Sequence, residues 1–287
     1  MTIRPPSRTA FAAAAHRAAH QVVEHGRIFS DPLAVRIIGG SAEEVGEQAR
    51  AEPARAGMRF FVSARSRIAE DMIAEGVAQR GLSQLVVLGA GLDTFAYRNP
   101  HPSLRVFEVD HAGTQAWKRQ RLTDAGIAAP EALTYVSVDF EHDDLMERLT
   151  TAGLDLQRRT FFLWLGVVPY LTRQAIEATL KATASLPGGA EIAFDYGEPP
   201  DNLSPELREI HERRAKYLAE LGEPFLSMFA PDDLHGMLTA AGYSQINDLD
   251  AGDMIERFAD PEVLAAAKAR GVMRPTSSGH VVVAMTS

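Results

Sequence analysis

Six short apolar runs alternate with helix-forming segments between Gln84 and the end of the chain, and this alternation constrains the fold more than any other feature. Strands that are each followed by a helix build a parallel sheet with helices packed on its faces. The sequence therefore predicts an α/β protein with a Rossmann-like, doubly wound and mostly parallel sheet. The apolar runs are residues 85–88, 106–109, 135–138, 161–164, 192–196 and 281–285.

Residues 1–60 show a different pattern, in which Ala-rich stretches alternate with Arg, His and Glu and no β-branched stretch appears. We expect these residues to form an N-terminal helical cap and residues 61–287 to form the main domain. Within the cap, Ser30-Asp31-Pro32 indicates a helix start. Residues 199–221, between the last two apolar runs, are polar and helix-forming, and they predict a helical lid inserted into the main domain.

Composition excludes several classes of protein. The chain has 287 residues and no cysteine, which removes thiolate catalysis, cysteine-bound zinc, iron–sulfur clusters and disulfide scaffolds. The formal charge of -9 argues against nucleic acid or an anionic membrane as a partner. No His or acidic cluster has metal-ligand spacing, so no metal is expected. The most apolar N-terminal stretch is broken by His16 and Arg17, which favours a cytoplasmic protein without a signal peptide or membrane span.

The turn Gly89-Ala90-Gly91 follows directly on the first apolar run. Glycines at this point let a ligand approach the backbone, and the first strand-to-helix turn of a doubly wound sheet borders the ligand crevice. A dinucleotide fingerprint needs a third glycine where this chain has Thr94, and Asp93 would repel a pyrophosphate. An acidic residue suits a positively charged ligand, and S-adenosylmethionine carries both a sulfonium and an ammonium group.

Acidic residues follow at the ends of the next two strands. Glu108 and Asp110 lie about 20 residues beyond the glycines, the spacing at which a carboxylate binds ribose hydroxyls, and Asp110 is the better candidate. Glu108 is equally well explained as a buried partner for a basic residue. Asp139 could accept a hydrogen bond from an adenine amino group while the backbone N–H of Phe140 meets a ring nitrogen; alternatively, Asp139 is a helix N-cap.

The order and spacing of these motifs resemble the class I S-adenosylmethionine-dependent methyltransferases, and more narrowly the leucine carboxyl methyltransferase family with its bacterial and polyketide carboxyl methyltransferase members. This resemblance implies a seven-stranded sheet, S-adenosyl-L-methionine as cofactor and S-adenosyl-L-homocysteine as product. It also implies that Arg65 binds the cofactor's carboxylate, although a solvated helix face would explain that arginine too. The resemblance rests on residues 88–94, Tyr97-Arg98, residues 107–110, Val138-Asp139 and residues 166–171.

One position departs from the family pattern. Members often carry Glu before the Gly-Val pair at the end of the fourth strand, where this chain has Leu165. Leu165 or Trp164 could form an apolar wall of the cofactor site instead, although a Trp in an apolar run is more often part of the core. Tyr170 and Tyr196, near the ends of the fourth and fifth strands, either line an acceptor pocket or simply pack.

The resulting prediction is an O-methyltransferase that acts on a carboxylate of a small molecule, as a monomer or homodimer. A carboxylate is already ionised at neutral pH, so no general base is needed and no catalytic residue is assigned. A hydroxyl acceptor would require a base. Two alternatives remain, a nicotinamide-dependent oxidoreductase and a non-catalytic S-adenosylmethionine-binding protein. The candidate bases for a hydroxyl acceptor are His20, His111, His142, His211 and His235.

Overall fold

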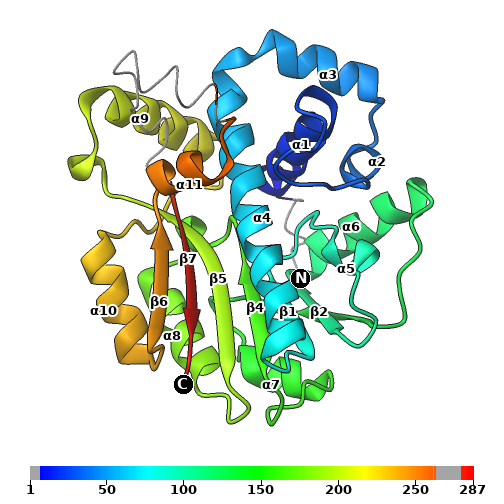
Figure 1. Ribbon diagram of the computed structural model, residues 1–287, viewed down its shortest axis with the longest axis vertical. Helices are drawn as coiled ribbons and strands as arrows, with labels where there is room; N and C mark the ends of the chain where they lie inside the picture. The colour runs from blue at the N-terminus through cyan, green and yellow to red at the C-terminus, as the bar shows by residue number, and fades with distance from the viewer. Residues whose placement is uncertain (1–6, 261, 263–278) are drawn as a thin grey trace.

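The computed structural model describes residues 7–260, 262 and 279–287, so that parts of both predicted domains, residues 1–6, 261 and 263–278, lie outside the described residues. Its centre is a seven-stranded sheet flanked by helices on both faces (Figure 1). The predicted α/β, doubly wound and mostly parallel fold is confirmed. The strands are β1 (Gln84–Leu88), β2 (Arg105–Asp110), β3 (Leu133–Ser137), β4 (Thr160–Trp164), β5 (Ala190–Gly197), β6 (Gln245–Leu249) and β7 (Gly279–Met285).

The strand order is β3-β2-β1-β4-β5-β7-β6, with β7 antiparallel to both of its neighbours. Within the sheet, the chain enters at β1 and runs outward through β2 to β3. It then returns and places β4 on the other side of β1. Ligands of open α/β sheets bind at the carboxyl ends of the strands on either side of such a reversal. The topology alone therefore places the candidate site above β1 and β4.

The hydrophobic core lies in two layers because side chains of a buried strand alternate between its faces. Val86 and Leu88 pack on one face against α7 (Leu145–Thr151), α8 (Arg173–Ala184) and α10 (Pro231–Ala241). Leu85 and Val87 pack on the other against α4 (Ala56–Gln79), α5 (Phe95–Arg98) and α11 (Ala251–Phe258). Two further elements connect strands of the sheet: helix α6 (Ala112–Asp124) follows β2, and the single turn η2 (Val168–Tyr170) follows β4.

The N-terminal segment and the insert both lie at the end of the sheet to which the parallel strands run (Figure 1). The first contains α1 (Arg8–Val23), α2 (Ala34–Ile38), α3 (Ala42–Ala51) and η1 (Pro53–Arg55). The insert contains η3 (Pro200–Asn202) and α9 (Pro205–Glu220), as the helical reading of residues 199–221 predicts. Within the described residues, no helix combines the length and apolar character that a bilayer span requires.

Two details of the fold differ from the sequence pattern. No apolar run marks β6, because this edge strand has the sequence Gln-Ile-Asn-Asp-Leu and is only partly buried. Helix α4 begins at Ala56, so it crosses the boundary between residues 60 and 61, and the N-terminal segment continues into the main domain without a break. The division into two domains stays a prediction.

Candidate functional site

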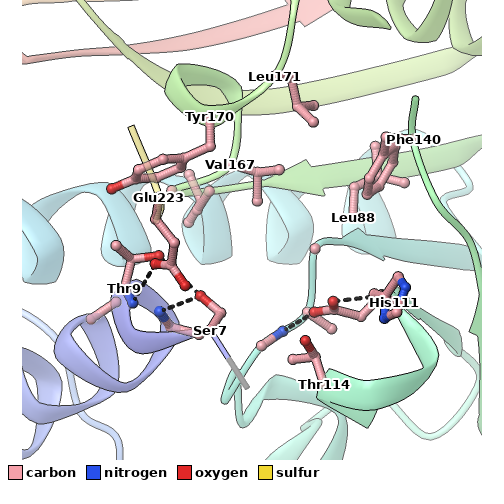
Figure 2. A pocket seen from close by; sticks show the side chains of 18 of the residues that line it. Ser7, Thr9, Leu88, His111, Thr114, Phe140, Val167, Tyr170, Leu171 and Glu223 are labelled. Carbon is pink, nitrogen blue, oxygen red and sulfur yellow. Dashed lines mark hydrogen bonds between the residues drawn. The ribbon is translucent and has the colours of Figure 1, made fainter. Parts of the chain in front are cut away.

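A cavity of about 660 Å³ opens above the carboxyl ends of β1 and β4, and Figure 2 shows its walls. Cofactor pockets have volumes of roughly 300 to 1,000 Å³. Sequence-predicted cofactor residues line it together, although they come from five separate parts of the chain. These are Arg65, Gly89, Ala90, Gly91, Asp93, Asp110, Asp139, Phe140 and Leu165.

The glycine turn forms the floor of this large cavity. Gly89 has φ +64° and Gly91 has φ +44°, conformations that favour glycine. A Cβ atom on Gly89 would lie 2.4 Å from Cγ2 of Val167, and one on Gly91 would lie 2.9 Å from Cβ of Ala10. Val167 and Ala10 therefore leave no room for a side chain at Gly89 or Gly91, and the turn exposes only backbone at these two residues.

Asp110 joins the glycine turn to the end of β2. Its carboxylate accepts hydrogen bonds of 2.7 Å from the backbone N–H of both Gly91 and His111, while still lining the cavity. Burial raises the pKa of Asp110, and the two N–H donors partly counter this rise. The carboxylate is fixed in place with acceptor capacity left toward the cavity, because each oxygen can accept more than one hydrogen bond.

Glu108 is a structural residue and is absent from the cavity walls. Its Oε2 lies 2.8 Å from Nζ of Lys118, and both side chains are almost fully buried. Burial raises the pKa of Glu108 to about 7 even beside this ammonium group. Of the two sequence readings, the buried partner of a basic residue is the one confirmed.

Asp93 and Asp139 both stabilise local turns at the rim of the cavity. Asp93 accepts a hydrogen bond from the N–H of Phe95 at 2.8 Å, and Asp139 accepts one from the N–H of Glu141 at 3.1 Å. Asp139 is no helix N-cap, since that position of α7 belongs to Asp144. The ring of Phe140 faces the cavity opposite Thr114 (Figure 2).

Arg65 reaches the cavity from α4 and is held by an acidic partner. Its Nη1 donates to Asp195 at 2.7 Å, and the other oxygen of Asp195 accepts the N–H of Gly166 at 2.6 Å. The Nε atom of Arg65 is buried and has no hydrogen-bond partner. One edge of this guanidinium group is therefore fixed, and the other retains capacity for an anion.

Trp164 does not line the cavity, contrary to its prediction as a cofactor-site residue. Its side chain is fully buried in the core, where the ring packs between Phe140 at 6.3 Å and Phe194 at 6.0 Å between centroids. The strand alternation explains this placement, because Trp164 shares the face of Phe162 while Leu165 turns to the cavity. Leu165 supplies the apolar wall.

A second cavity of about 140 Å³ adjoins the first. Both predicted pocket tyrosines line this smaller cavity, and Tyr170 lines the large one as well. Tyr196 is buried, donates a hydrogen bond to Asp248 at 2.7 Å, and stacks on His280. Its hydroxyl is thus engaged away from a ligand, which makes Tyr196 a packed wall residue.

The five candidate histidines are scattered. His111 and His142 line the large cavity, but Nδ1 of His111 accepts the N–H of Gly113 and the His142 side chain is 80% exposed. His211 lines the smaller cavity, where it stacks on Phe225. Neither His20 nor His235 lines either cavity. Among these five, His211 therefore lines a cavity with a side chain that is neither hydrogen-bonded to the backbone nor largely exposed.

Several site residues carry no recognisable motif. Helix α1 contributes Thr9, Ala10, Ala13 and Arg17 to the large cavity, together with its N-cap Ser7. Ala10, Ala13 and Arg17 are spaced by about one helical turn. Glu223, just after α9, accepts hydrogen bonds of 2.9 Å from the N–H groups of Arg8 and Thr9. Figure 2 shows the contact with Thr9. Contacts separated by more than 200 residues leave no local pattern, so sequence reasoning misses them.

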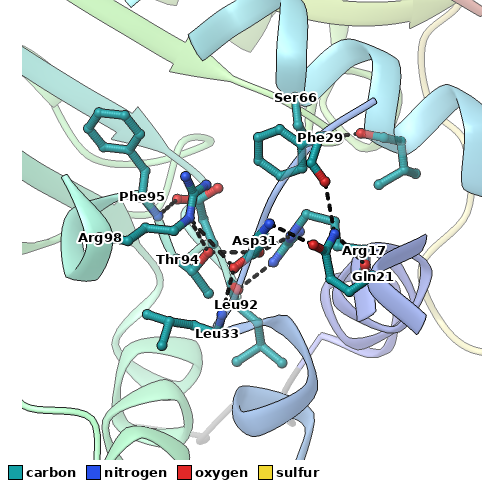
Figure 3. A network of polar contacts seen from close by, with 12 residues as sticks. Arg17, Gln21, Phe29, Asp31, Leu33, Ser66, Leu92, Thr94, Phe95 and Arg98 are labelled. Carbon is teal, nitrogen blue, oxygen red and sulfur yellow. Dashed lines mark hydrogen bonds and ion pairs between the residues drawn. The ribbon is translucent and has the colours of Figure 1, made fainter. Parts of the chain in front are cut away.

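Asp31 anchors the N-terminal segment to the glycine turn (Figure 3). Its fully buried carboxylate accepts hydrogen bonds from Nε of Arg17 at 3.1 Å and from the hydroxyl of Thr94 at 2.8 Å. It also lies 3.5 Å from Nε of Arg98, and Arg17 in turn donates to the carbonyl of Leu92 at 2.7 Å. The Ser30-Asp31-Pro32 signal thus marks an anchor, while helix α2 itself begins at Ala34.

Comparison with known proteins places the fold and the family. The chain is 31% identical over 221 residues to a protein of Mycobacterium avium (strain 104) named "Putative S-adenosyl-L-methionine-dependent methyltransferase", which covers 74% of this chain and 68% of that protein. It is 35% identical over 181 residues to YktD of Bacillus subtilis (strain 168), which carries the same designation, over 62% of this chain and 59% of YktD.

A solved structure of a DUF574 family protein from Streptomyces avermitilis superposes with a TM-score of 0.55, at 17% identity over 94% of this chain and all of that one; this likeness shows the fold alone. The model of the leucine carboxyl methyltransferase family matches residues 10–184, which is more than half of the chain. The matched region includes α1, the glycine turn, the acidic strand ends and Arg65. The chain therefore belongs to the leucine carboxyl methyltransferase family.

Proposed function

We propose that this protein is an S-adenosylmethionine-dependent methyltransferase that methylates a carboxylate oxygen of a small molecule. The observation that carries the proposal is a single cavity lined by the glycine turn, by the Asp110 carboxylate and by Arg65, whose buried Nε has no hydrogen-bond partner. Family membership supports the same cofactor. It also disfavours the nicotinamide alternative, which the absence of a third glycine at Thr94 already weakens.

The residues present fit this cofactor. A Cβ atom at Gly89 or Gly91 has no room, so the turn can present only backbone to a ligand. The buried Nε of Arg65, which has no partner of its own, suits the carboxylate of an amino-acid moiety. Asp110 would accept the ribose hydroxyls, and Asp139 with the N–H of Phe140 would meet the adenine edge.

Bound there, S-adenosylmethionine supplies a methyl group whose transfer to a carboxylate oxygen forms an O–C bond, leaves the C–S electron pair on sulfur and releases no proton. The protein's part is to align the acceptor and exclude water. Leu165 and Val167 form an apolar wall beside the glycine turn, and this wall removes water from the side where β4 ends. No side chain has to accept a proton.

Calorimetry with S-adenosylhomocysteine tests the cofactor. We expect saturable binding of this compound and no response to NAD or NADP. Replacing Asp110 with Ala should weaken binding by about 1–3 kcal/mol, because a charge-assisted hydrogen bond is lost. Asp124→Ala, at an exposed position outside the cavity, is the matched control. Equal affinities of the two variants would remove Asp110 from the cofactor site.

Label transfer tests the reaction. Methyl-labelled cofactor incubated with a broad library of carboxylic acids should yield methyl esters of some members. If the cofactor binds but no acid in the library acquires the methyl label, the result would support the non-catalytic alternative.

A hydroxyl acceptor is the second candidate, and one observation favours it. His211 lines the smaller cavity, and its pKa is lowered by burial and by the nearby Arg214, so the imidazole is neutral and able to accept a proton. A phenol panel run beside the acids separates the two candidates. Transfer to phenols that disappears in His211→Gln would favour the hydroxyl reaction.

A further inference from the structure

The smaller cavity lies where an acceptor could reach the large one. Its walls come from α4, from α9 and from the segment that follows α9, and it shares Arg65, Gly166 and Tyr170 with the large cavity. These three residues mark the boundary between the two spaces. A molecule in the smaller cavity therefore has one end at the proposed methyl donor, a point that rests on the proposed function.

One face of α9 covers the smaller cavity. Leu207, Ile210, His211 and Arg214 line it, and their spacing of three, four and seven residues places them on the same side of the helix. The opposite wall is apolar and aromatic, built by Met58 and Phe61 of α4 and by Phe225. The body of a molecule that fits here is apolar.

The volume limits the size of that body. A cavity of about 150 Å³ lined by apolar side chains holds one benzene molecule. The smaller cavity measures about 140 Å³, which matches the size of a single ring or a short branched chain.

Charge on the walls of the smaller cavity is unbalanced. The cation of Arg65 is neutralised by Asp195, which lines the same space. Arg214 has no carboxylate partner among the described residues: its contacts are Sδ of Met58 at 3.8 Å and the ring of Phe225 at 5.4 Å from Cζ. Its guanidinium donors remain available for an anion.

Positive charge gathers around this guanidinium group from other elements too. Burial and the surrounding guanidinium groups lower the pKa of His16 on α1 to about 4. Those groups belong to Arg55, Arg214, Arg65 and Arg59, of which Arg55 and Arg59 pair with glutamates while Arg65 pairs with Asp195. Arg214 is the member of this group without a carboxylate partner among the described residues, so an anion beside it would meet an uncompensated cation.

We infer that the smaller cavity is the acceptor pocket for a carboxylic acid with a single ring or short branched chain, whose carboxylate is bound by Arg214. Tyr170 lines the same cavity, and its hydroxyl makes no hydrogen bond to any described residue, so it offers the carboxylate a second donor. Arg214 is a specificity-determining residue: it selects anions in the smaller cavity, close enough to the boundary residue Tyr170 to act on it electrostatically.

The test compares Arg214→Gln with Arg213→Gln. Arg213 is the neighbouring residue on α9, is exposed and loses the same charge when replaced. Among the described residues, its ion pair is with Glu209 alone. Benzoate, phenylacetate and 3-methylbutanoate are the probes, and 2-naphthoate is the size control. Binding to the protein loaded with S-adenosylhomocysteine is followed by ligand-observed NMR, and ester formation with labelled cofactor gives KM and kcat.

We expect Arg214→Gln to weaken acid binding and raise KM by about 10- to 100-fold, since a hydrogen bond to a charged group is lost. Arg213→Gln should match the parent protein, and Arg214→Lys should recover part of the loss. Affinity for S-adenosylhomocysteine should stay unchanged in all three variants, because Arg214 does not line the large cavity. Tyr170→Phe should raise KM while the ring still packs on Phe225.

Three results would overturn the inference. They are equal acid affinity in Arg214→Gln and Arg213→Gln, equal use of naphthoate and benzoate, and transfer to phenols alone. The proposed function fails separately, when S-adenosylhomocysteine does not bind or when no acid in the broad library is methylated. Methyl esters formed only from larger acids would leave the proposed function standing and refute the assignment of this pocket.

Discussion

Single residues at the candidate site serve the fold and the ligand together, and Gly89 is the clearest case. Its left-handed backbone forms the turn under the proposed cofactor, and the missing side chain makes room for Val167 from the loop after β4. The close contact fixes the spacing between the ends of β1 and β4. A side chain at Gly89 would therefore disturb both the backbone and the wall of the large cavity.

Gly89→Ala and Gly81→Ala separate these two effects. Gly81 also has a positive φ, of +71°, but a Cβ atom there meets nothing within 4 Å. Gly81→Ala should lower the free energy of unfolding by about 1–2 kcal/mol through the backbone alone. Gly89→Ala should lose a further 1–3 kcal/mol or so from overpacking, as well as cofactor affinity. Urea unfolding measures the difference, and equal losses would contradict the contact with Val167.

Asp110 predicts a pH dependence of cofactor binding. Because burial raises its pKa, the carboxylate takes up a proton at a higher pH than an exposed Asp does. Protonation removes the charge that strengthens its hydrogen bonds, so affinity for S-adenosylhomocysteine should fall as the pH is lowered toward this pKa. Titrations between about pH 4.5 and 8 should show this fall in the parent protein and a flatter profile in Asp110→Asn. The same slope in both would assign the effect to another group.

At the scale of elements, the N-terminal helices depend on buried polar contacts as well as on apolar packing. These helices contribute to two small apolar clusters. One includes Ala14 and Ile37, and the other includes Ala18 and Val45. Asp31 adds the link from these helices to the glycine turn. Removing a buried carboxylate that pairs with arginines is strongly destabilising, because the arginine charges are left buried without a partner.

Asp31→Ala should therefore cost about 3–5 kcal/mol of stability, compared with less than about 1 kcal/mol for Asp260→Ala. Asp260 pairs with Arg27 at 2.9 Å, but that pair is exposed on both sides. Chemical denaturation of the two variants makes the comparison, with calorimetry on S-adenosylhomocysteine as a second readout. A small loss in Asp31→Ala would show that α1 is held by packing alone.

Across the whole molecule, local pattern predicts the sheet and the floor of the large cavity, while distant contacts decide the rest. The glycine turn and Asp110 could be predicted because each sits at a fixed position relative to a strand, whereas Arg65 was implied only by the family resemblance. Trp164 was misplaced because its strand-end position does not reveal which face its ring occupies. Asp31 and Glu223 could not be found, since their partners lie in other segments and no periodic pattern connects them.

The contact between Glu223 and α1 predicts how cofactor binding changes amide hydrogen exchange at the large cavity. Glu223 joins α1 to the segment after α9, and both line the large cavity. Binding of S-adenosylhomocysteine should slow amide exchange in the first turn of α1 and in residues 222–226. Glu223→Gln should reduce this protection, because an amide is a weaker acceptor than a carboxylate. Glu220→Gln on the exposed end of α9 is the control, and identical protection in both variants would refute the role of Glu223.

The contact through Glu223 also couples the residence time of the cofactor to that of the acceptor. The first turn of α1 covers the proposed cofactor, and the segment after α9 borders the proposed acceptor pocket. Loss of the Glu223 contact would free one wall of the large cavity and the neighbouring wall of the smaller one together. A spent cofactor and a finished ester then depart during the same opening, and a substitution that shortens the stay of one shortens the stay of the other.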